Sequence, residues 1–133
     1  MNHPKNPIVV LETPFEDARG GIQPLVDEDM KSAVLISSKK GTIRANHYHK
    51  TDWHYCYVLS GSIDYFYRAV GSTDKPQRVL IQPKQLFFTP PMLEHAMCFP
   101  EDTVFLCLGK NSREQKSYEA DIVRVQLVPQ YPL

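Results

Sequence analysis

Four of the five histidines in this chain fall in two short segments, a concentration that suits either metal binding or proton transfer. His47, His49 and His54 lie close together, and His95 follows further along the chain. Neutral imidazoles are good ligands for Zn, Cu, Fe and Ni. The imidazole pKa also lies near neutrality, where a general base works best. The fifth histidine, His3, lies in a polar, proline-broken terminus.

The spacing of these histidines predicts that they converge. His47 and His49 are two residues apart, so on a β-strand their side chains point to the same face. A bend over residues 50–53 brings His54 beside them at the start of the next strand. His95 follows two prolines that lead into another short strand. Because facing strands of a small barrel can direct several side chains to one point in the lumen, we expect these four histidines to be metal ligands. For His54, a hydrogen bond to a neighbouring residue is the alternative.

The elements that must position these histidines are short β-rich runs separated by turn residues. Eleven prolines fit an all-β chain, because proline is excluded from helix interiors. A tight hairpin is predicted at residues 60–62, and only residues 112–120 have the composition of a short helix. The close spacing of the runs favours an antiparallel sandwich or barrel. The predicted strands cover residues 8–11, 33–36, 55–59, 63–67, 78–81, 103–108 and 122–127.

Length and composition bound the remaining possibilities. The 133 residues suit one domain, with an N-terminal arm over residues 1–30 and a barrel over residues 31–128. Fifteen basic and fifteen acidic residues give a formal net charge of zero, which offers no electrostatic reason to expect a nucleic acid or an anionic membrane as partner. No apolar run approaches the roughly 18 residues of a membrane span, and no signal-peptide core is present, so we expect a cytoplasmic protein.

The three cysteines, Cys56, Cys98 and Cys107, are predicted to be thiols rather than a disulfide framework, because their number is odd. Cys56 and Cys107 lie in apolar strand-like runs, and free cysteine is among the most often buried residue types. We therefore expect both to be buried.

The segment from Gly41 to Gly61 resembles the first motif of the cupin family. That motif consists of glycine, five residues, His-x-His, four residues, a ligand position, six residues and glycine. His47, His49 and His54 occupy its ligand positions, although the family usually has glutamate where this chain has His54. The resemblance implies a divalent transition metal, and the all-nitrogen ligand set leaves its identity open among Zn, Fe, Mn, Ni and Cu.

The second cupin motif, Pro-x-Gly-x-x-His, is similar to residues 90–95, where Met92 replaces the glycine and His95 supplies the last ligand. Together the two motifs imply an all-β fold, the antiparallel double-stranded β-helix, or jelly-roll barrel, of a single cupin domain.

A narrower resemblance is to the RmlC-like, sugar-nucleotide branch of the cupins, which includes dTDP-4-dehydrorhamnose 3,5-epimerase and the dTDP-sugar ketoisomerases. Those enzymes carry Asp-x-Arg-Gly near the N-terminus and Arg-Gly-x-His around the catalytic base. The matching residues here are Asp17, Arg19, Gly20, Arg44 and His47, with Ala45 in place of the second glycine.

Such epimerases and ketoisomerases remove a proton next to a carbonyl group, and the resemblance implies a role for four residues. His47 could be the base. Tyr65 or Tyr67 could be the acid, although packing in the barrel is the alternative for each tyrosine. Arg44 could hold a phosphate or carboxylate bidentately, or simply be solvated at the surface.

Three functions are compatible with this sequence. The first is an isomerase or epimerase acting on a sugar or sugar-nucleotide carbonyl compound in carbohydrate metabolism. The second is a mononuclear metal-dependent dioxygenase, and the third is a non-catalytic sugar-binding or sensor protein. The fold alone cannot choose among them. The expected partner is a sugar-derived small molecule, and a homodimer is expected because the two-fold dimer is the commonest soluble oligomer.

Overall fold

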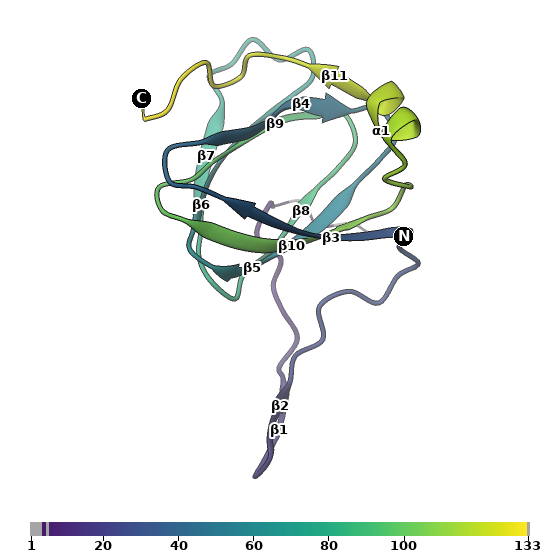
Figure 1. Cartoon of the computed structure of the whole chain (residues 1–133), viewed down its shortest axis with the longest axis vertical. Helices are drawn as coiled ribbons and strands as arrows, with labels where there is room; N and C mark the ends of the chain where they lie inside the picture. The colour runs from purple at the N-terminus through teal and green to yellow at the C-terminus, as the bar shows by residue number, and fades with distance from the viewer. Residues whose placement is uncertain (1–3, 5, 133) are drawn as a thin grey trace.

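The chain folds into two facing antiparallel sheets in a computed structural model that describes residue 4 and residues 6–132 (Figure 1). One sheet has the strand order β3-β10-β5-β8 and the other β11-β4-β9-β6-β7. His3 lies outside the described residues. The strands are β3 (Ser32–Ser38), β4 (Ile43–His49), β5 (His54–Ser60), β6 (Ile63–Ala69), β7 (Gln77–Ile81), β8 (Leu86–Thr89), β9 (Leu93–Cys98), β10 (Thr103–Gly109) and β11 (Ile122–Arg124).

The core lies between the two sheets and is built from the inward-facing residues of alternating strands. Phe105 comes from one sheet, Tyr65 from the other, and both are fully buried. A second, smaller cluster lies where residues 125–131 cover the outer face of the β4-containing sheet. The predicted all-β jelly roll is therefore confirmed. The main core cluster consists of Cys56, Val58, Ile63, Tyr65, Ile81, Phe87, Phe99, Phe105 and Cys107.

The predicted elements differ from the structure at the two ends of the chain and at β8, which lies outside the predicted strands. The hairpin at residues 60–62 is present, and the one helix, α1 (Gln115–Asp121), lies close to the predicted residues 112–120. The run at residues 8–11 is not a strand: only Ile8 forms a bridge, with Phe87, and Val10 is almost fully exposed. The run at 122–127 forms a strand only as far as Arg124, because the register with β4 ends there. Both runs are apolar enough for a strand, but each is paired over only part of its length.

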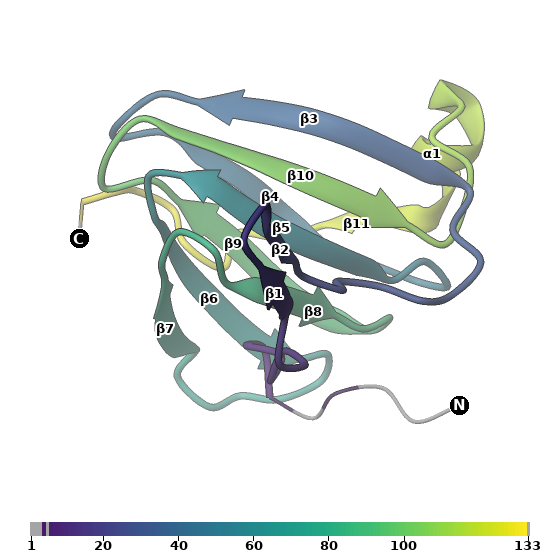
Figure 2. The ribbon, with the colours of Figure 1, turned by 90° about the horizontal axis from the view of Figure 1, so that it is seen from below.

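The N-terminal arm projects from the barrel as a narrow hairpin of β1 (Phe15–Asp17) and β2 (Gly20–Ile22), as Figure 1 shows; in Figure 2, seen from below, the hairpin lies in front of the barrel. All six residues of these strands are exposed. Its cross-strand pair, Phe15 and Ile22, exposes large apolar side chains. The arm thus extends apolar surface away from the barrel.

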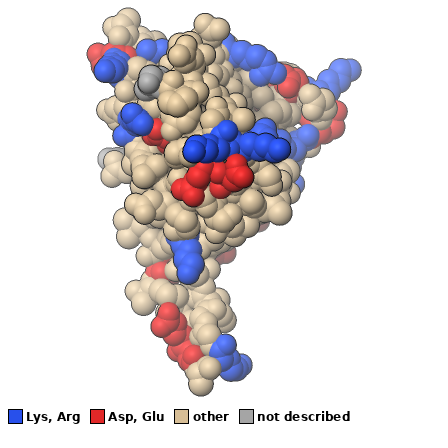
Figure 3. All heavy atoms as spheres, turned by 60° about the vertical axis from the view of Figure 1, so that its left-hand side comes forward, with Lys and Arg blue, Asp and Glu red and all other residues tan. Residues whose placement is uncertain are grey.

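Charges of both signs are interspersed over the face of the molecule seen in Figure 3, which fits the absence of net charge. Within the described part of the chain, no helix is both long and apolar enough to span a membrane.

The hairpin between β5 and β6 depends on Gly61, which gives a first testable prediction. Its φ of +84° is a left-handed conformation, and an added Cβ would lie 2.3 Å from the Thr103 Oγ1 atom and 2.4 Å from the Asp102 carbonyl oxygen. We expect Gly61→Ala to lower the free energy of unfolding by about 3 kcal/mol, from strain and overpacking together.

The matched control is Gly71→Ala. Gly71 has a similar φ of +89°, but its added Cβ would meet nothing within 4 Å, so only the backbone strain, about 1 kcal/mol, remains. Urea unfolding of the two variants measures both values. Equal losses would show that the contact with β10 does not matter.

Candidate functional site

The first histidine pair owes its direction to an irregularity in β4. Ala45 and Asn46 both have positive φ values, 70° and 53°, and the pairing of β4 with β9 shifts between Ala45 and His47. A bulge of this kind turns the following side chains relative to the sheet. Asn46 tolerates this conformation well, and its side-chain amide donates to the Val128 carbonyl and accepts from the Val128 N–H. The bulge therefore fixes His47 and His49 while anchoring the C-terminal segment.

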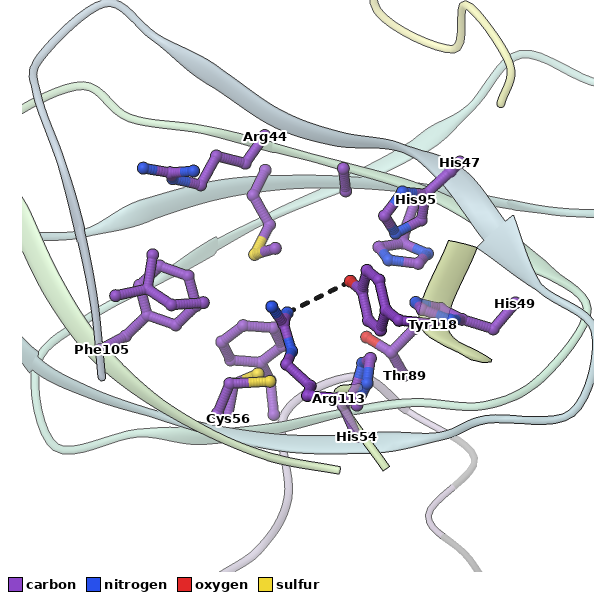
Figure 4. Close-up of a pocket in the computed structure, with 15 residues that line it drawn as sticks. Arg44, His47, His49, His54, Cys56, Thr89, His95, Phe105, Arg113 and Tyr118 are labelled. Atoms are coloured by element: carbon purple, nitrogen blue, oxygen red, sulfur yellow. Dashed lines mark hydrogen bonds between the residues drawn. The ribbon is translucent and has the colours of Figure 1, made fainter. Parts of the chain in front are cut away.

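The four predicted histidines do come together. The ring centroids of His47 and His49 are 4.7 Å apart, those of His47 and His95 4.9 Å, and those of His49 and His54 4.7 Å. All four are buried and line one cavity of about 240 Å³ in the barrel lumen (Figure 4). The cluster lies at one end of this cavity and Arg44 at the other.

His95 is oriented by the second motif. Its Nδ1 lies 2.9 Å from the Leu93 carbonyl oxygen, so Nδ1 carries the proton and Nε2 keeps its lone pair. Met92, where the family has glycine, adopts a φ of +59° and donates its N–H to the His49 carbonyl. The backbone here has a left-handed conformation that glycine adopts readily, and in this chain methionine occupies it.

His54 differs from the other three because it is hydrogen-bonded to a buried carboxylate. Its Nε2 lies 2.8 Å from Asp52 Oδ2, and Asp52 is almost completely buried. The other carboxylate oxygen accepts the N–H groups of Trp53 and Asn111, which holds the carboxylate still. The structure thus contains the alternative predicted for His54, a hydrogen bond to a neighbouring residue.

The protonation of the four imidazoles follows from burial and from this carboxylate. Burial, together with the neighbouring histidines, lowers the pKa of His47 to about 3 and moves the pKa of His95 well below its usual value. Burial also lowers the pKa of His49 to about 4. Burial is the largest influence on the pKa of His54 and acts in the same direction, but the hydrogen bond that His54 donates to Asp52 and the charges of Cys107 and Asp52 together outweigh it, and the pKa rises. The cavity therefore holds three neutral imidazoles and one basic one.

The donor set fits a metal ion. Among the described residues, His49 has two buried ring nitrogens without a hydrogen-bond partner, although its Nδ1 lies 3.5 Å from Asp121 Oδ2. Buried polar atoms without partners are costly, and a coordinate bond is one way to satisfy them. One ligand atom from each of His47, His49 and His95 lies within 4.8 Å of the others, and His49 forms a second such group with Asp52 and His54.

Two cavity residues were missed by the sequence reasoning. Tyr118 lies in α1 and Arg113 in the segment before it, and both line the cavity (Figure 4). The Arg113 guanidinium lies over the Tyr118 ring, 4.3 Å from its centroid, and donates a hydrogen bond of 3.2 Å to the Tyr118 hydroxyl. None of the ion pairs between described residues includes Arg113. No sequence motif or residue spacing indicated that the segment containing Arg113 and Tyr118 lies beside the histidines. Asp121 fixes it by accepting from the Thr51 and Asp52 backbone N–H groups.

The predicted acid and anion-binding residues are distributed differently. Arg44 lines the cavity, where its guanidinium is hydrogen-bonded to the Ser38 hydroxyl and the Ser37 carbonyl. Tyr65 is buried in the core outside the cavity lining, and its hydroxyl lies 2.6 Å from that of Thr89, which does line it. Tyr67 lines a separate surface depression. The structure brings Arg44 to the histidines' cavity but not the two tyrosines.

All three cysteines are free thiols, as predicted, and the expected burial of Cys56 and Cys107 is confirmed; Cys98 is buried as well. Cys56 and Cys107 line the cavity, whereas Cys98 lies in the second core cluster. The adjacent Cys56 thiol, against the effect of burial, lowers the pKa of Cys107 to about 7.

Comparisons with known proteins give a match at the level of structure. No family model and no curated protein matches this chain. Among solved structures, the sugar 3,4-ketoisomerase QdtA from Thermoanaerobacterium thermosaccharolyticum, in complex with TDP, has a TM-score of 0.70 at 18% identity, over 91% of this chain and 90% of that one. The dTDP-4-dehydrorhamnose 3,5-epimerase from Sulfolobus tokodaii has a TM-score of 0.70 at 15% identity, over 96% and 88%. The TDP-fucose-3,4-ketoisomerase WlaRA from Campylobacter jejuni has 0.69 at 14%, over 86% and 85%. At these identities the likeness is one of fold, and this chain shares the jelly-roll fold of these three proteins.

Proposed function

We infer that this protein is an isomerase or epimerase that moves a proton next to the carbonyl group of a sugar-derived compound. The observation that carries this inference is the buried His54–Asp52 pair beside three neutral imidazoles in one cavity. The similar solved structures include sugar-nucleotide ketoisomerases and an epimerase, and this supports the choice of reaction and of substrate class.

The proton acceptor is His54 rather than His47. A base needs a pKa near the working pH, and only His54 among the four imidazoles has a raised pKa. Asp52 accepts the Nε2–H of His54 and so leaves Nδ1 to take the substrate proton. The buried carboxylate then stabilises the imidazolium that forms, as in other His–Asp pairs. His47, whose pKa is lowered to about 3, is the weaker base.

Two other cavity residues can bind the enolate oxygen and the phosphate charge of the substrate. Tyr118 lines the cavity with its hydroxyl, and this makes it the candidate acid for the enolate oxygen. Arg113 has no carboxylate partner among the described residues, so its guanidinium is available for a phosphate group. A cavity of about 240 Å³ suits a single sugar ring, which leaves the nucleotide outside it near Arg113.

A divalent transition metal is part of the proposal. His47, His49 and His95 are the residues that would hold it, on the grounds of their spacing and of the partnerless nitrogens of His49. When bound, such an ion polarises a carbonyl oxygen as a Lewis acid. In that arrangement His54 remains with Asp52 as the base.

Metal binding gives a second prediction. We expect His47→Ala/His49→Ala to abolish bound metal, because it removes two of three ligands, and His54→Ala to retain it. Elemental analysis after reconstitution with Zn, Fe, Mn, Ni or Cu measures the stoichiometry. Melting temperature is the second readout, since binding to the folded form alone raises it. Wild-type protein that binds none of these metals would remove the metal from the proposal while leaving the His54–Asp52 chemistry intact.

A third prediction concerns assembly. We expect a homodimer in which the projecting arm, with exposed Phe15 and Ile22, packs against the second subunit. Phe15→Ser/Ile22→Ser should weaken association. Light scattering at micromolar concentration measures the mass, and a monomeric wild-type protein would contradict the expectation.

The function itself is tested by incubating the protein with TDP-4-keto-6-deoxyglucose, the compound bound in one similar ketoisomerase structure. Proton NMR should show a ketone shifted to the neighbouring carbon or a configuration inverted beside it. Oxygen consumption during the same incubation would favour the dioxygenase alternative. Tight binding without any conversion would favour a sensor.

A further inference from the structure

The cavity contains a feature that proton transfer does not use, a pair of cysteines on neighbouring strands. Cys56 of β5 and Cys107 of β10 are direct partners in the antiparallel register. Residues opposed in this way have Cα atoms about 4.5–5.5 Å apart. A disulfide spans Cα separations of about 4.4–6.8 Å, so the backbone already has the separation that this bond requires.

Both thiols also face the same space. Cys56 and Cys107 line the cavity that holds the histidines, although only 3% and 5% of their surfaces are exposed. Cys56 shares its strand face with His54, two residues earlier. A small oxidant that enters the cavity therefore reaches both sulfurs.

We propose that Cys56 and Cys107 form an oxidisable dithiol that closes to a reversible disulfide across β5 and β10 in the wall of the cavity. The oxidant is a peroxide. One sulfur, as its thiolate, attacks a peroxide oxygen, so an S–O bond forms, the O–O bond breaks and hydroxide leaves as water after taking a proton. The second sulfur then attacks the resulting sulfenic acid and releases another water. Two electrons pass from the sulfurs to peroxide, and an external dithiol reverses the change.

Oxidation changes the cavity without changing the chain's topology. The bond replaces two thiol groups at the wall next to His54 and ties β5 to β10 at a point where the strands are already paired. The inference does not depend on the proposed reaction, because the cysteines and their register are independent of the substrate.

Cys98 supplies an internal control. It is buried on the other side of the β4-containing sheet, against Phe66 and Leu127, and it does not line the cavity. We expect native wild-type protein treated with one equivalent of hydrogen peroxide to lose about 2 Da. It should keep one thiol that is titratable after unfolding. Peptide mapping should identify that thiol as Cys98 and should find the peptides of Cys56 and Cys107 linked. Dithiothreitol should restore all three thiols.

The single variants Cys56→Ser and Cys107→Ser should gain oxygen, about 16 or 32 Da, instead of losing two hydrogens. The wild-type measurement alone decides the matter even if a variant fails to fold. Three thiols retained after peroxide, oxygen added to either cavity cysteine without a link, or a link that involves Cys98 or a second molecule would each overturn the proposal.

Discussion

Replacing Asp52 by asparagine should reduce the turnover number for isomerisation by about a thousandfold, which is within the range that general-base catalysis contributes. An amide in place of the carboxylate presents an N–H to Nε2 of His54, so this nitrogen must give up its proton and Nδ1 becomes protonated. The base is then in the wrong tautomer and has lost the negative charge that stabilises its protonated form. The amide oxygen of the variant can still accept the Trp53 and Asn111 N–H groups, so the loop should remain in place.

Asp64→Asn is the matched control for this substitution. Asp64 is also a buried carboxylate, but it binds Arg78 and Tyr131 and does not line the histidine cavity. Its replacement should lower the melting temperature and leave the turnover number unchanged. Steady-state kinetics should show the Asp52 effect in the turnover number, with little change in the Michaelis constant. A loss that appears only in the Michaelis constant would assign Asp52 to binding instead.

The metal-free protein should lose stability steeply in mild acid. The pKa of His47 is lowered to about 3 and that of His49 to about 4, whereas in the unfolded chain both lie near 6.5. Below pH 6.5 the unfolded state therefore takes up protons that the folded state refuses. Between pH 6.5 and its folded-state pKa, each such imidazole lowers the free energy of unfolding by about 1.4 kcal/mol for every pH unit that the pH falls.

His54 acts in the opposite direction. Its raised pKa adds stability below the unfolded value, and this contribution is lost as the pH rises through the folded-state pKa. Because three imidazoles outweigh one, urea midpoints should fall clearly between pH 6.5 and pH 5. His47→Asn should flatten that dependence, because it removes one of the suppressed imidazoles. Urea midpoints that are independent of pH in this window would show that the histidines are protonated in the folded state.

Much of the site could be predicted because its residues are set by strand geometry and by two motifs. The two-residue spacing of His47 and His49 fixes a common face, and the turn around residues 50–53 returns His54 to it. The bulge at Ala45 and Asn46 was not predictable, since neither residue is a glycine and the contact of Asn46 with Val128 that accompanies the bulge is distant in sequence.

The remaining features of the site could not be predicted, because they depend on contacts between residues distant in sequence. Arg113 and Tyr118 reach the cavity because Asp121 binds the turn before β5, and no local pattern records that contact. Tyr65 and Tyr67 had the alternation of a strand, but alternation does not say which inward residue meets the cavity and which the core. The pairing of Asp52 with His54 likewise requires the fold of the turn.

The most direct test of proton transfer is solvent exchange. The protein is incubated with TDP-4-keto-6-deoxyglucose in D₂O, and deuterium at the carbon next to the carbonyl group is followed by NMR and mass spectrometry. We expect the wild-type protein to incorporate one deuterium at that carbon, and His54→Gln and Asp52→Asn each to slow this incorporation about a thousandfold. Substrate that binds in a thermal-shift assay but retains its hydrogen at that carbon in the wild-type protein would contradict it.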